Sequence, residues 1–494
     1  MNYKLLAKVL GSLLTLESVA MALCGLFGLA DPVSDRGSAV APLMTGAGMT
    51  FVAGILLMAF GIGKYERIPR REGVVIVGLG WLLCAVFGAT PFVLSQPGLS
   101  AGEALFEAVS GFTTTGATVI TDLDEWPRGV LLWRAVTQWL GGLGILVLFV
   151  AILSTLGGGA KSLFRNESSF QTGEASSARI RDTALTLWKV YLVLTVVCLL
   201  GLRLLGMSWF DAVAHATTCV STGGFSPHDA SIAHFSGWRT GALIELWLLL
   251  FMLLASVSFL IYVVAMQRRW DRLKREEEAK WYGGLIVVSV GAVAAVVFLA
   301  AGPEGGETVR GVAFTVVSIV STTGYVTVDY GGWPVGAHFV LLGLMLIGGC
   351  AGSTAGGMKV SRIILLVRSA HHEIVRAFRP NQVFRVQVNG NPIDETARAQ
   401  TVLFVALFAL MALGSMIVIA FLEAARGAQF ETMVAAVMAS IGNIGPGLGE
   451  VGPTGNYAGL RPATHLFLAL LMVLGRLELY AVLVLFVPAA WRKY

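Results

Sequence analysis

Four short polar turns, each with a glycine near its end, recur along the chain. They read F-T-T-T-G-A-T at 112–118, C-V-S-T-G-G-F at 219–225, V-S-T-T-G-Y-V at 320–326 and S-I-G-N-I-G-P-G at 440–447. Glycine adopts backbone conformations that other residues avoid, so successive carbonyl groups can be aimed along one axis. A ring of such oxygens, with Ser and Thr hydroxyls beside them, can replace the hydration shell of a cation. The turns therefore predict a cation site made largely of backbone.

The turns are also regularly spaced. If Gly116, Gly223, Gly324 and Gly445 are equivalent, they are separated by 107, 101 and 121 residues, and a long apolar stretch lies on each side of every turn. One glycine turn is a weak signal, but four in the same register indicate an internal repeat. Only the first two apolar stretches, up to about residue 62, lie outside this repeat.

A shorter apolar stretch leads into each turn. These stretches are 101–115, 209–220, 308–321 and 430–441. They are too short to cross a bilayer, so we expect re-entrant half-helices, which lipid permits only where the backbone is buried in protein or lines water. A folded outer cap is the alternative. The C-terminal end of a half-helix is partly negative, which would favour a cation at the turn that follows.

The composition requires lipid as the solvent for much of the chain. Hydrophobic residues make up 56% of the 494 and charged residues 13%, and the mean hydropathy is +0.76, whereas a soluble protein has about 25% charged residues. A spanning helix needs roughly 20 apolar residues. We predict spans near 5–29, 39–62, 73–94, 131–153, 184–205, 241–265, 282–301, 336–358, 401–422 and 464–487. The predicted fold is therefore an all-α polytopic membrane protein, and the first span is expected to be a retained helix because no small-residue cleavage site ends it.

The basic residues predict the orientation of these spans. Of the 35 Lys and Arg, 25 fall on one side of the membrane and six on the other. The positive-inside rule then places both termini in the cytoplasm. Anionic lipid headgroups account for the net charge of +5, so no nucleic-acid partner is expected.

Residues for catalysis or for a resident metal are not evident. The five cysteines lie in or beside apolar stretches without metal-ligand spacing, which favours structural thiols over a disulfide framework. No H-x-x-x-H, D-x-x-x-D or G-x-S-x-G arrangement qualifies as a catalytic or metal site. We therefore expect no enzyme and no organic cofactor, and a polytopic membrane enzyme is the remote alternative.

Glycines interrupt the eighth predicted span. They are Gly348, Gly349, Gly352, Gly356 and Gly357, with Ser353 and Thr354 among them. Each glycine costs about 1 kcal/mol in a helix interior relative to Ala, so the stretch cannot be a stable helix interior. Close helix packing through small residues is the alternative explanation.

One arginine, Arg476, lies near the middle of the last span. Burying it without partners costs at least ~2.5–3.5 kcal/mol, so we expect it to face a polar pocket or a pathway through the membrane. A salt bridge to Glu245 or Glu478 is the alternative. His215, which precedes the second turn, is expected to cap or pack its half-helix.

Taken together, these motifs resemble the Trk/Ktr/HKT superfamily of potassium transporters, and within it the bacterial Trk-type membrane subunit. The matching pieces are the four turns, G-G-C-A-G-S-T-A-G-G-M-K at 348–359, G-P-G-L-G at 445–449 and G-R-L-E-L-Y at 475–480. The likeness covers essentially the whole chain. It implies a potassium-channel-like arrangement of four helix–pore helix–helix modules around one pore: an N-terminal helix pair at 1–72, then modules at 73–157, 158–265, 266–372 and 373–494.

The resemblance also implies which residues contact potassium, the transported ion. The expected selectivity filter is Thr114, Thr115, Gly116; Ser221, Thr222, Gly223; Thr322, Thr323, Gly324; and Asn443, Ile444, Gly445. All four glycines are present, whereas sodium-selective plant relatives have Ser at the first, which favours potassium. The fourth turn departs from the others because Asn-Ile replaces the Ser/Thr pair.

A gate and partners are implied in the same way. The gate would be an unwound intramembrane loop below the filter, with Arg476 as an electrostatic barrier; the loop residues are Gly349, Gly352, Ser353, Thr354, Gly356 and Gly357. Trk-type subunits work as homodimers in the bacterial inner membrane with a cytoplasmic nucleotide-binding ring protein (TrkA-like), which loops 158–182, 266–280 and 359–400 would contact. Symport of potassium with protons or sodium stays open as the alternative. A chloride-type transporter fits poorly, because it would turn half-helix N-termini toward the ion.

Overall fold

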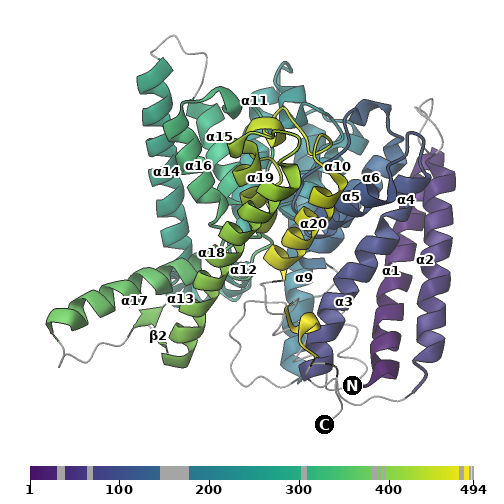
Figure 1. The fold of residues 1–494 in the computed structure, drawn as a ribbon, viewed down its shortest axis with the longest axis horizontal. Coiled ribbons are helices and arrows are strands. Elements are labelled where there is room, and N and C mark those ends of the chain that lie inside the picture. Colours follow the sequence, from purple (N-terminus) through teal and green to yellow (C-terminus); the bar gives the residue numbers. More distant parts are fainter. Residues whose placement is uncertain are drawn as a thin grey trace.

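The computed structural model describes residues 1–30, 39–63, 70–144, 177–301, 309–379, 386–388, 391–393, 395–477, 483–488 and 491. Helices make up most of these residues (Figure 1). Within them the strands are limited to a small hairpin, β1 (Gln387–Val388) paired with β2 (Asn391–Pro392). The predicted all-α class is confirmed.

The first two helices form a closely packed pair at one edge of the molecule (Figure 1). They are α1 (Tyr3–Ala30) and α2 (Val40–Phe60). A Cβ atom added at Gly11 would lie 2.5 Å from the Gly54 carbonyl oxygen. The two backbones therefore touch through glycines, which is how membrane helices commonly pack because small residues allow close approach.

Six helices among the described residues are long and apolar enough to cross a membrane. They are α1, α2, α3 (Arg70–Gly88) continued by α4 (Thr90–Leu94), α9 (Ser177–Leu204), α14 (Glu278–Ala301) and α18 (Glu395–Glu423). A seventh span is the pair α11 (Gly241–Ser256) and α12 (Phe259–Met266), bent by 87° at the break between them. Large apolar side chains such as Leu200, Val287 and Phe421 are exposed on these helices, as lipid-facing positions should be.

Three of the ten expected spans are shorter helices. α6 (Arg128–Trp139) passes into a π-helical turn at 140–144, and the rest of the predicted span 131–153 lies outside the described residues. α16 (Val335–Met345) ends where the glycine-rich stretch begins, so the predicted span 336–358 is interrupted where its glycines indicate. α20 (Pro462–Arg476) ends at Arg476. The glycines explain the break after α16, because each weakens a helix interior.

Each of the four short apolar stretches forms a helix of 12 or 13 residues. These half-helices are α5 (Ala101–Phe112), α10 (Trp209–Val220), α15 (Val309–Val320) and α19 (Phe430–Gly442). Ser100 and Glu103 form a capping box at the start of α5, and Ser208 accepts a hydrogen bond from the Asp211 amide at the start of α10. Such caps satisfy amides that have no partner within the helix and so fix where it begins.

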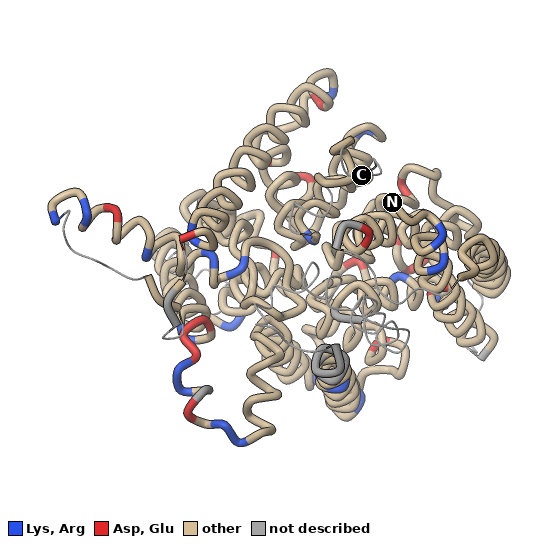
Figure 2. The backbone as a smooth tube through the Cα atoms, turned by 90° about the horizontal axis from the view of Figure 1, so that it is seen from below, with Lys and Arg blue, Asp and Glu red and all other residues tan. Residues whose placement is uncertain are grey.

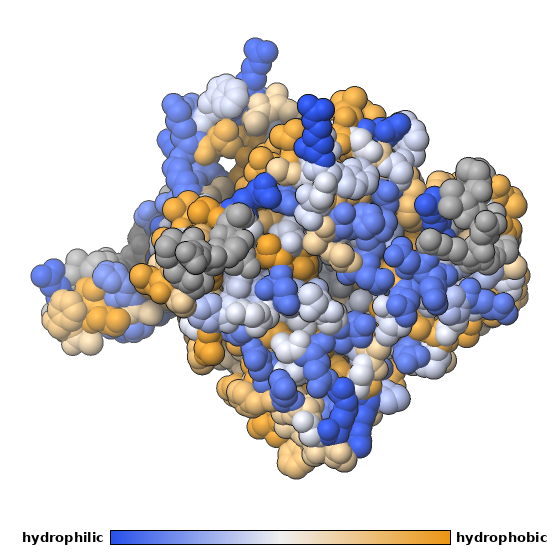
Figure 3. Space-filling view, turned by 90° about the horizontal axis from the view of Figure 1, so that it is seen from above, coloured by the Kyte–Doolittle hydropathy of each residue, from blue (hydrophilic) through white to orange (hydrophobic). Residues whose placement is uncertain are grey.

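The lower side of the molecule in Figure 1 carries the N-terminus and two helices rich in basic residues. They are α13 (Trp270–Lys274) and α17 (Val360–Phe378), and α17 projects sideways from the bundle (Figures 1 and 2). The 3₁₀ helices are at Leu123–Glu125, Ser231–Phe235, Tyr330–Gly332, Gly449–Val451 and Val484–Phe486. Seen from above, the opposite face has hydrophilic residues over its centre and hydrophobic residues toward its edge (Figure 3).

A candidate ion pathway built from four turns

The four turns that follow the half-helices meet at one cavity of about 80 Å³. Its lining includes one glycine from each turn, namely Gly116, Gly224, Gly324 and Gly445. Successive members of this set are 100 to 121 positions apart in the sequence, and the fold places them around a single opening.

The backbone of the four turns has one shared conformation. The first residue of each is in the left-handed region: Thr114 (φ 52°), Thr222 (φ 54°), Thr322 (φ 57°) and Asn443 (φ 55°). The glycine two residues later also has positive φ: Gly116 (84°), Gly224 (75°), Gly324 (78°) and Gly445 (95°). Non-glycine residues rarely adopt such angles. A conformation repeated four times supports the internal repeat independently of sequence spacing.

Hydrogen bonds to the half-helices fix this register. The residue between the two positive-φ positions donates its amide to the carbonyl five residues back in every turn. The pairs are Thr115 to Ser110, Gly223 to Thr218, Thr323 to Ser318 and Ile444 to Ala439, at 2.8–2.9 Å. Each half-helix is therefore closed at its C-terminal end by its own turn.

This register corrects one expected equivalence. We expected Gly223 to correspond to Gly116, but Gly224 occupies that position, and Gly223 corresponds to Thr115. The second turn therefore consists of Thr222, Gly223 and Gly224, and Ser221 comes one residue earlier. The physical reason lies on α6: the Gln138 side chain fills the space where a Cβ of residue 223 would be. Gln138 donates to the Gly223 carbonyl at 2.7 Å and accepts the Phe225 amide at 3.0 Å.

Contacts between neighbouring turns close a ring. A Cβ atom at Gly116 would overlap the Gly223 carbonyl oxygen, and one at Gly224 would overlap the Thr323 carbonyl oxygen. The series continues from Gly324 to the Ile444 carbonyl, and from Gly445 back to the Thr115 carbonyl at 2.6 Å. Each turn thus packs on the next in cyclic order. Glycine is required at these four positions both by the positive φ and by the neighbouring carbonyl.

The fourth turn uses its unusual residue to bridge its neighbours. Asn443 donates through Nδ2 to Thr115 Oγ1 at 3.0 Å and to the Met472 carbonyl at 2.9 Å. Its Oδ1 atom and the Thr114 hydroxyl are buried and have no hydrogen-bond partner among the described residues. Buried polar atoms are usually paired, so these two oxygens are exceptions at the turns.

His215 is a structural residue of the second half-helix. Its ring is buried, with Nδ1 2.8 Å from the Asp211 carbonyl and Nε2 3.1 Å from Ser226 Oγ. It therefore ties α10 to the segment after the second turn, in agreement with the expectation that it packs this helix.

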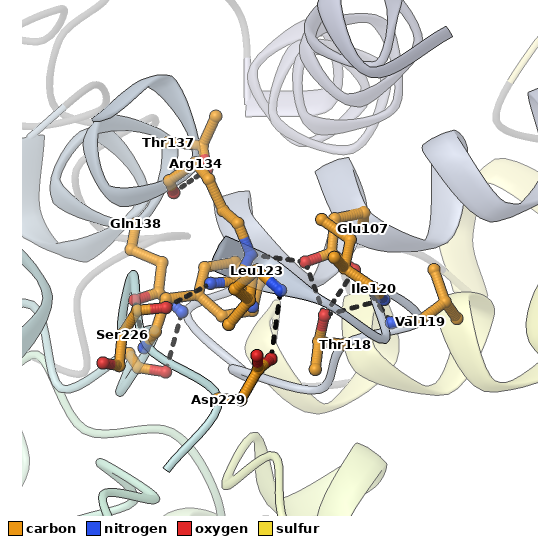
Figure 4. Close-up of polar contacts among 12 residues, drawn as sticks. Glu107, Thr118, Val119, Ile120, Leu123, Arg134, Thr137, Gln138, Ser226 and Asp229 are labelled. Carbon is orange, nitrogen blue, oxygen red and sulfur yellow. Dashed lines mark hydrogen bonds and ion pairs between the residues drawn. The ribbon is translucent and has the colours of Figure 1, made fainter. Parts of the chain in front are cut away.

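An ion pair lies behind the first two turns, and sequence reasoning did not select it. Arg134 on α6 and Glu107 on α5 approach to 2.6 Å and are both buried (Figure 4). Arg134 lies within the predicted span 131–153. The sequence does contain a sign of this pair, because an Arg in an apolar span and a Glu in an apolar half-helix each require a partner inside a membrane.

The glycine-rich stretch crosses beneath the turns without helical structure from Gly348 to Lys359. Thr354 donates its hydroxyl to the Val220 and Ala255 carbonyls, both at 3.0 Å. The Gly356 amide donates to Thr322 Oγ1 of the third turn at 2.8 Å. The stretch is thereby attached directly to the ends of two half-helices.

Arg476 at the end of α20 contacts this stretch. It donates to the Thr354 carbonyl at 2.7 Å and to the Gly141 and Gly142 carbonyls at 2.9 and 2.8 Å. Glu245, considered as a salt-bridge partner, instead pairs with Arg310 at 2.7 Å. Glu478 lies outside the described residues. The arginine thus joins the last helix, the π-helical turn after α6 and the glycine-rich stretch.

A buried carboxylate also holds the glycine-rich stretch and the helix that follows it. Glu278, at the start of α14, is 6% exposed, and its Oε1 accepts the Ala351 and Ser361 amides, both at 2.8 Å. Charged acceptors make stronger hydrogen bonds than neutral ones. The interior of the stretch at Ala351 and the start of α17 at Ser361 are therefore anchored to one side chain.

The protein has many apolar spanning helices and four half-helices, and the turns after the half-helices surround one opening above a non-helical stretch. This arrangement is that of membrane proteins that transport ions. Comparison with known proteins agrees: residues 49–282 and 297–493 match the TrkH family, described as cation transport protein. The chain is a member of this family.

Individual relatives match along their full length. The chain is 37% identical to the Trk system potassium uptake protein TrkH of Halomonas elongata and 34% identical to that of Escherichia coli K12, with 100% of each sequence covered. The crystal structure of the potassium transporter TrkH from Vibrio parahaemolyticus superposes with a TM-score of 0.87 at 31% identity, again over 100% of both chains.

Proposed function

We propose that this protein takes up potassium across the bacterial inner membrane through the ring of four turns. The observation that carries the proposal is the cyclic packing of four turns with one backbone conformation around one opening. Carbonyl and hydroxyl oxygens in such a ring replace the water shell of a dehydrated cation. The relatives are named as potassium uptake proteins, which favours potassium as the ion and transport over the enzyme alternative.

The proposed filter is Thr114–Gly116, Thr222–Gly224, Thr322–Gly324 and Asn443–Gly445. Relative to the expectation from sequence, Gly224 joins the set and Ser221 leaves it. The half-helices end at these turns, and their C-terminal dipoles add partial negative charge there. An anion would meet carbonyl oxygens from every side, so the same geometry disfavours anions.

The proposed gate is the glycine-rich stretch with Arg476. A cation that leaves the turns meets this stretch. Gly356 is hydrogen-bonded to the third turn, and Thr354 is hydrogen-bonded to the end of the second half-helix. The Arg476 guanidinium lies against it, and a fixed positive charge in a low-dielectric pathway repels a cation. Opening then requires the stretch and Arg476 to move apart or aside.

The proposed regulation is cytoplasmic. Residues 266–280 and the described part of 359–400 lie on the side of the N-terminus (Figure 1), while loop 158–182 lies mostly outside the described residues. We place both termini in the cytoplasm and assign to this face a nucleotide-binding ring protein of the TrkA type and a homodimeric assembly. The relatives' designation as a Trk system supports a multi-component assembly.

Reconstitution tests the function. Purified protein in vesicles should take up a potassium or rubidium isotope down its gradient, and the absence of uptake would refute the transport proposal. Currents that reverse at the potassium Nernst potential, unchanged by a proton or sodium gradient, are expected for a channel. A reversal potential that follows the proton or sodium gradient would establish the symport alternative instead.

A further inference from the structure

Burial of the Glu107–Arg134 ion pair costs free energy. The two side chains are 0% and 3% exposed. Removing two ions from water costs several kcal/mol for each, and apolar replacements of such pairs are often neutral or stabilising. Stability therefore does not account for the pair, and its remaining contacts indicate what it does.

Glu107 holds the segment that leaves the first turn. Its carboxylate accepts hydrogen bonds from Thr118 Oγ1 and from the Val119 amide, both at 3.0 Å. Thr118 and Val119 follow Gly116 by two and three residues. The backbone just beyond the first filter glycine is therefore fixed to a side chain of its own half-helix.

Arg134 holds the corresponding segment of the second turn. Its Nη1 donates to the Ser226 carbonyl at 2.9 Å, and its guanidinium lies over the Phe225 ring, 3.5 Å from the centroid. Ser226 follows Gly224 by two residues, as Thr118 follows Gly116. The ion pair thus joins equivalent points of two neighbouring turns, from Thr118 through Glu107 and Arg134 to Ser226 (Figure 4).

The contacts at two other junctions between turns are neutral. Tyr325 after the third turn donates to the His215 carbonyl of α10 at 3.0 Å, and Asn443 bonds Thr115 across the junction of the fourth and first turns. Among the described residues, Glu107–Arg134 is the ion pair whose two members each bond the segment leaving a different turn, whereas the His228–Asp211 pair lies within the second repeat alone. The first junction therefore has a connection that the others lack.

We propose that Glu107 and Arg134 are positioning residues that set the separation of the first and second turns and thereby determine which cation the ring accepts. The inference rests on the proposed role of the turns as the filter. Selectivity depends on the size of the ring or on the number and orientation of its carbonyls, and both change if two turns separate. Neither side chain contacts the ion.

The test measures ion preference in full-length protein reconstituted in vesicles. Arg134→Lys keeps the charge, but a compact ammonium cannot reproduce the guanidinium fork that reaches Glu107 and Ser226 together. We expect the potassium-over-sodium permeability ratio, read from reversal potentials, to fall roughly tenfold, the effect of losing one hydrogen bond to a charged group. Thr118→Val removes a hydroxyl that donates to the Glu107 carboxylate, again a hydrogen bond to a charged group, and should lower the ratio by a similar factor.

The matched control is Arg310→Lys in the Glu245–Arg310 pair, which is 2.7 Å long and touches no turn; it should leave the ratio unchanged. Wild-type ratios in both Arg134→Lys and Thr118→Val would overturn the proposal. If Arg134→Lys does not fold, Thr118→Val, which removes only one hydroxyl, decides the question. An unchanged ratio in Gly116→Ser would instead refute the filter itself, so the two failures are distinguishable.

Discussion

Arg476 donates a hydrogen bond to the Thr354 carbonyl at 2.7 Å, which links the end of the last described long helix to the middle of the glycine-rich stretch. The two residues are 122 positions apart. The same guanidinium also reaches the Gly141 and Gly142 carbonyls. Three structural elements therefore meet at one positive charge beneath the turns, and the stretch is held across the pathway by contacts that can be removed individually.

Replacing Arg476 by Ala should raise basal potassium flux. The substitution removes both the positive charge and the bond to Thr354, and each 1.4 kcal/mol of barrier corresponds to tenfold in rate, so we expect an increase of roughly tenfold. Isotope uptake into vesicles measures it, with Arg310→Ala as the control for loss of an arginine elsewhere. Shortening the stretch within 349–357 should have the same effect, and flux at the wild-type level in both variants would exclude this stretch as the barrier.

Gly116→Ser should admit sodium. The new side chain would meet the Gly223 carbonyl, and residue 116 has a φ of 84° that costs roughly 1–2 kcal/mol for a residue with a Cβ. Displacement of that carbonyl changes the ring, so the potassium-over-sodium ratio should fall. Gly102→Ser is the control, because a Cβ at Gly102 would meet no atom within 4 Å. An unchanged ratio in Gly116→Ser contradicts the assignment of the filter.

The two adjacent glycines of the second turn should respond differently to Ala. Gly224→Ala strains a φ of 75° and overlaps the Thr323 backbone, so potassium selectivity should be lost. In Gly223→Ala the nearest atoms to the new Cβ belong to the Gln138 side chain. That side chain can be shortened, so the double variant Gly223→Ala/Gln138→Ala should recover more selectivity than Gly223→Ala alone. Reversal potentials measure both. A Gly223→Ala variant more damaged than Gly224→Ala would make Gly223, and not Gly224, the equivalent of Gly116.

Glu278→Gln should loosen the glycine-rich stretch. Hydrogen bonds to a charged acceptor contribute about 1.5–3 kcal/mol, against about 1 kcal/mol for a neutral one, so both amide contacts weaken while the side-chain shape is kept. We expect basal flux to rise severalfold and thermal stability to fall. Glu277→Gln is the neighbouring control, since Glu277 forms a 2.9 Å ion pair with Arg368 and does not bond the stretch in the described contacts. Flux equal to wild type would show that Glu278 does not restrain the stretch.

Much of the fold was accessible from local sequence. Apolar length and scarcity of charge identify spanning helices because lipid offers no hydrogen-bond partner to the backbone, and the half-helices followed from apolar stretches too short to span. The glycines that follow Leu346 indicate that α16 ends before them, because each glycine weakens a helix interior. The exact limits of α6 and α20 did not follow, since the apolar character of both segments continues in the sequence past Gly144 and past Arg476.

The register of the second turn shows where sequence reasoning was insufficient. The second turn contains two adjacent glycines, Gly223 and Gly224. Comparison of the four turn sequences alone equates the first of them with Gly116. The choice depends on Gln138, which lies 85 residues earlier in the chain than Gly223 and fills the space of a side chain at 223. Such a relation exists only after α6 has packed against the turn.

By itself the sequence determined that the chain spans a membrane many times, that four glycine turns repeat, and that a glycine-rich stretch and a lone arginine break the pattern of the spans. These features are local, because hydrophobicity and backbone propensity act over a few residues. Only the tertiary structure decided which carbonyl each glycine contacts, that Arg476 binds Thr354 and not Glu245, and that Glu107 and Arg134 join two turns. Those contacts arise between distant segments, and their geometry is set by packing around a common opening.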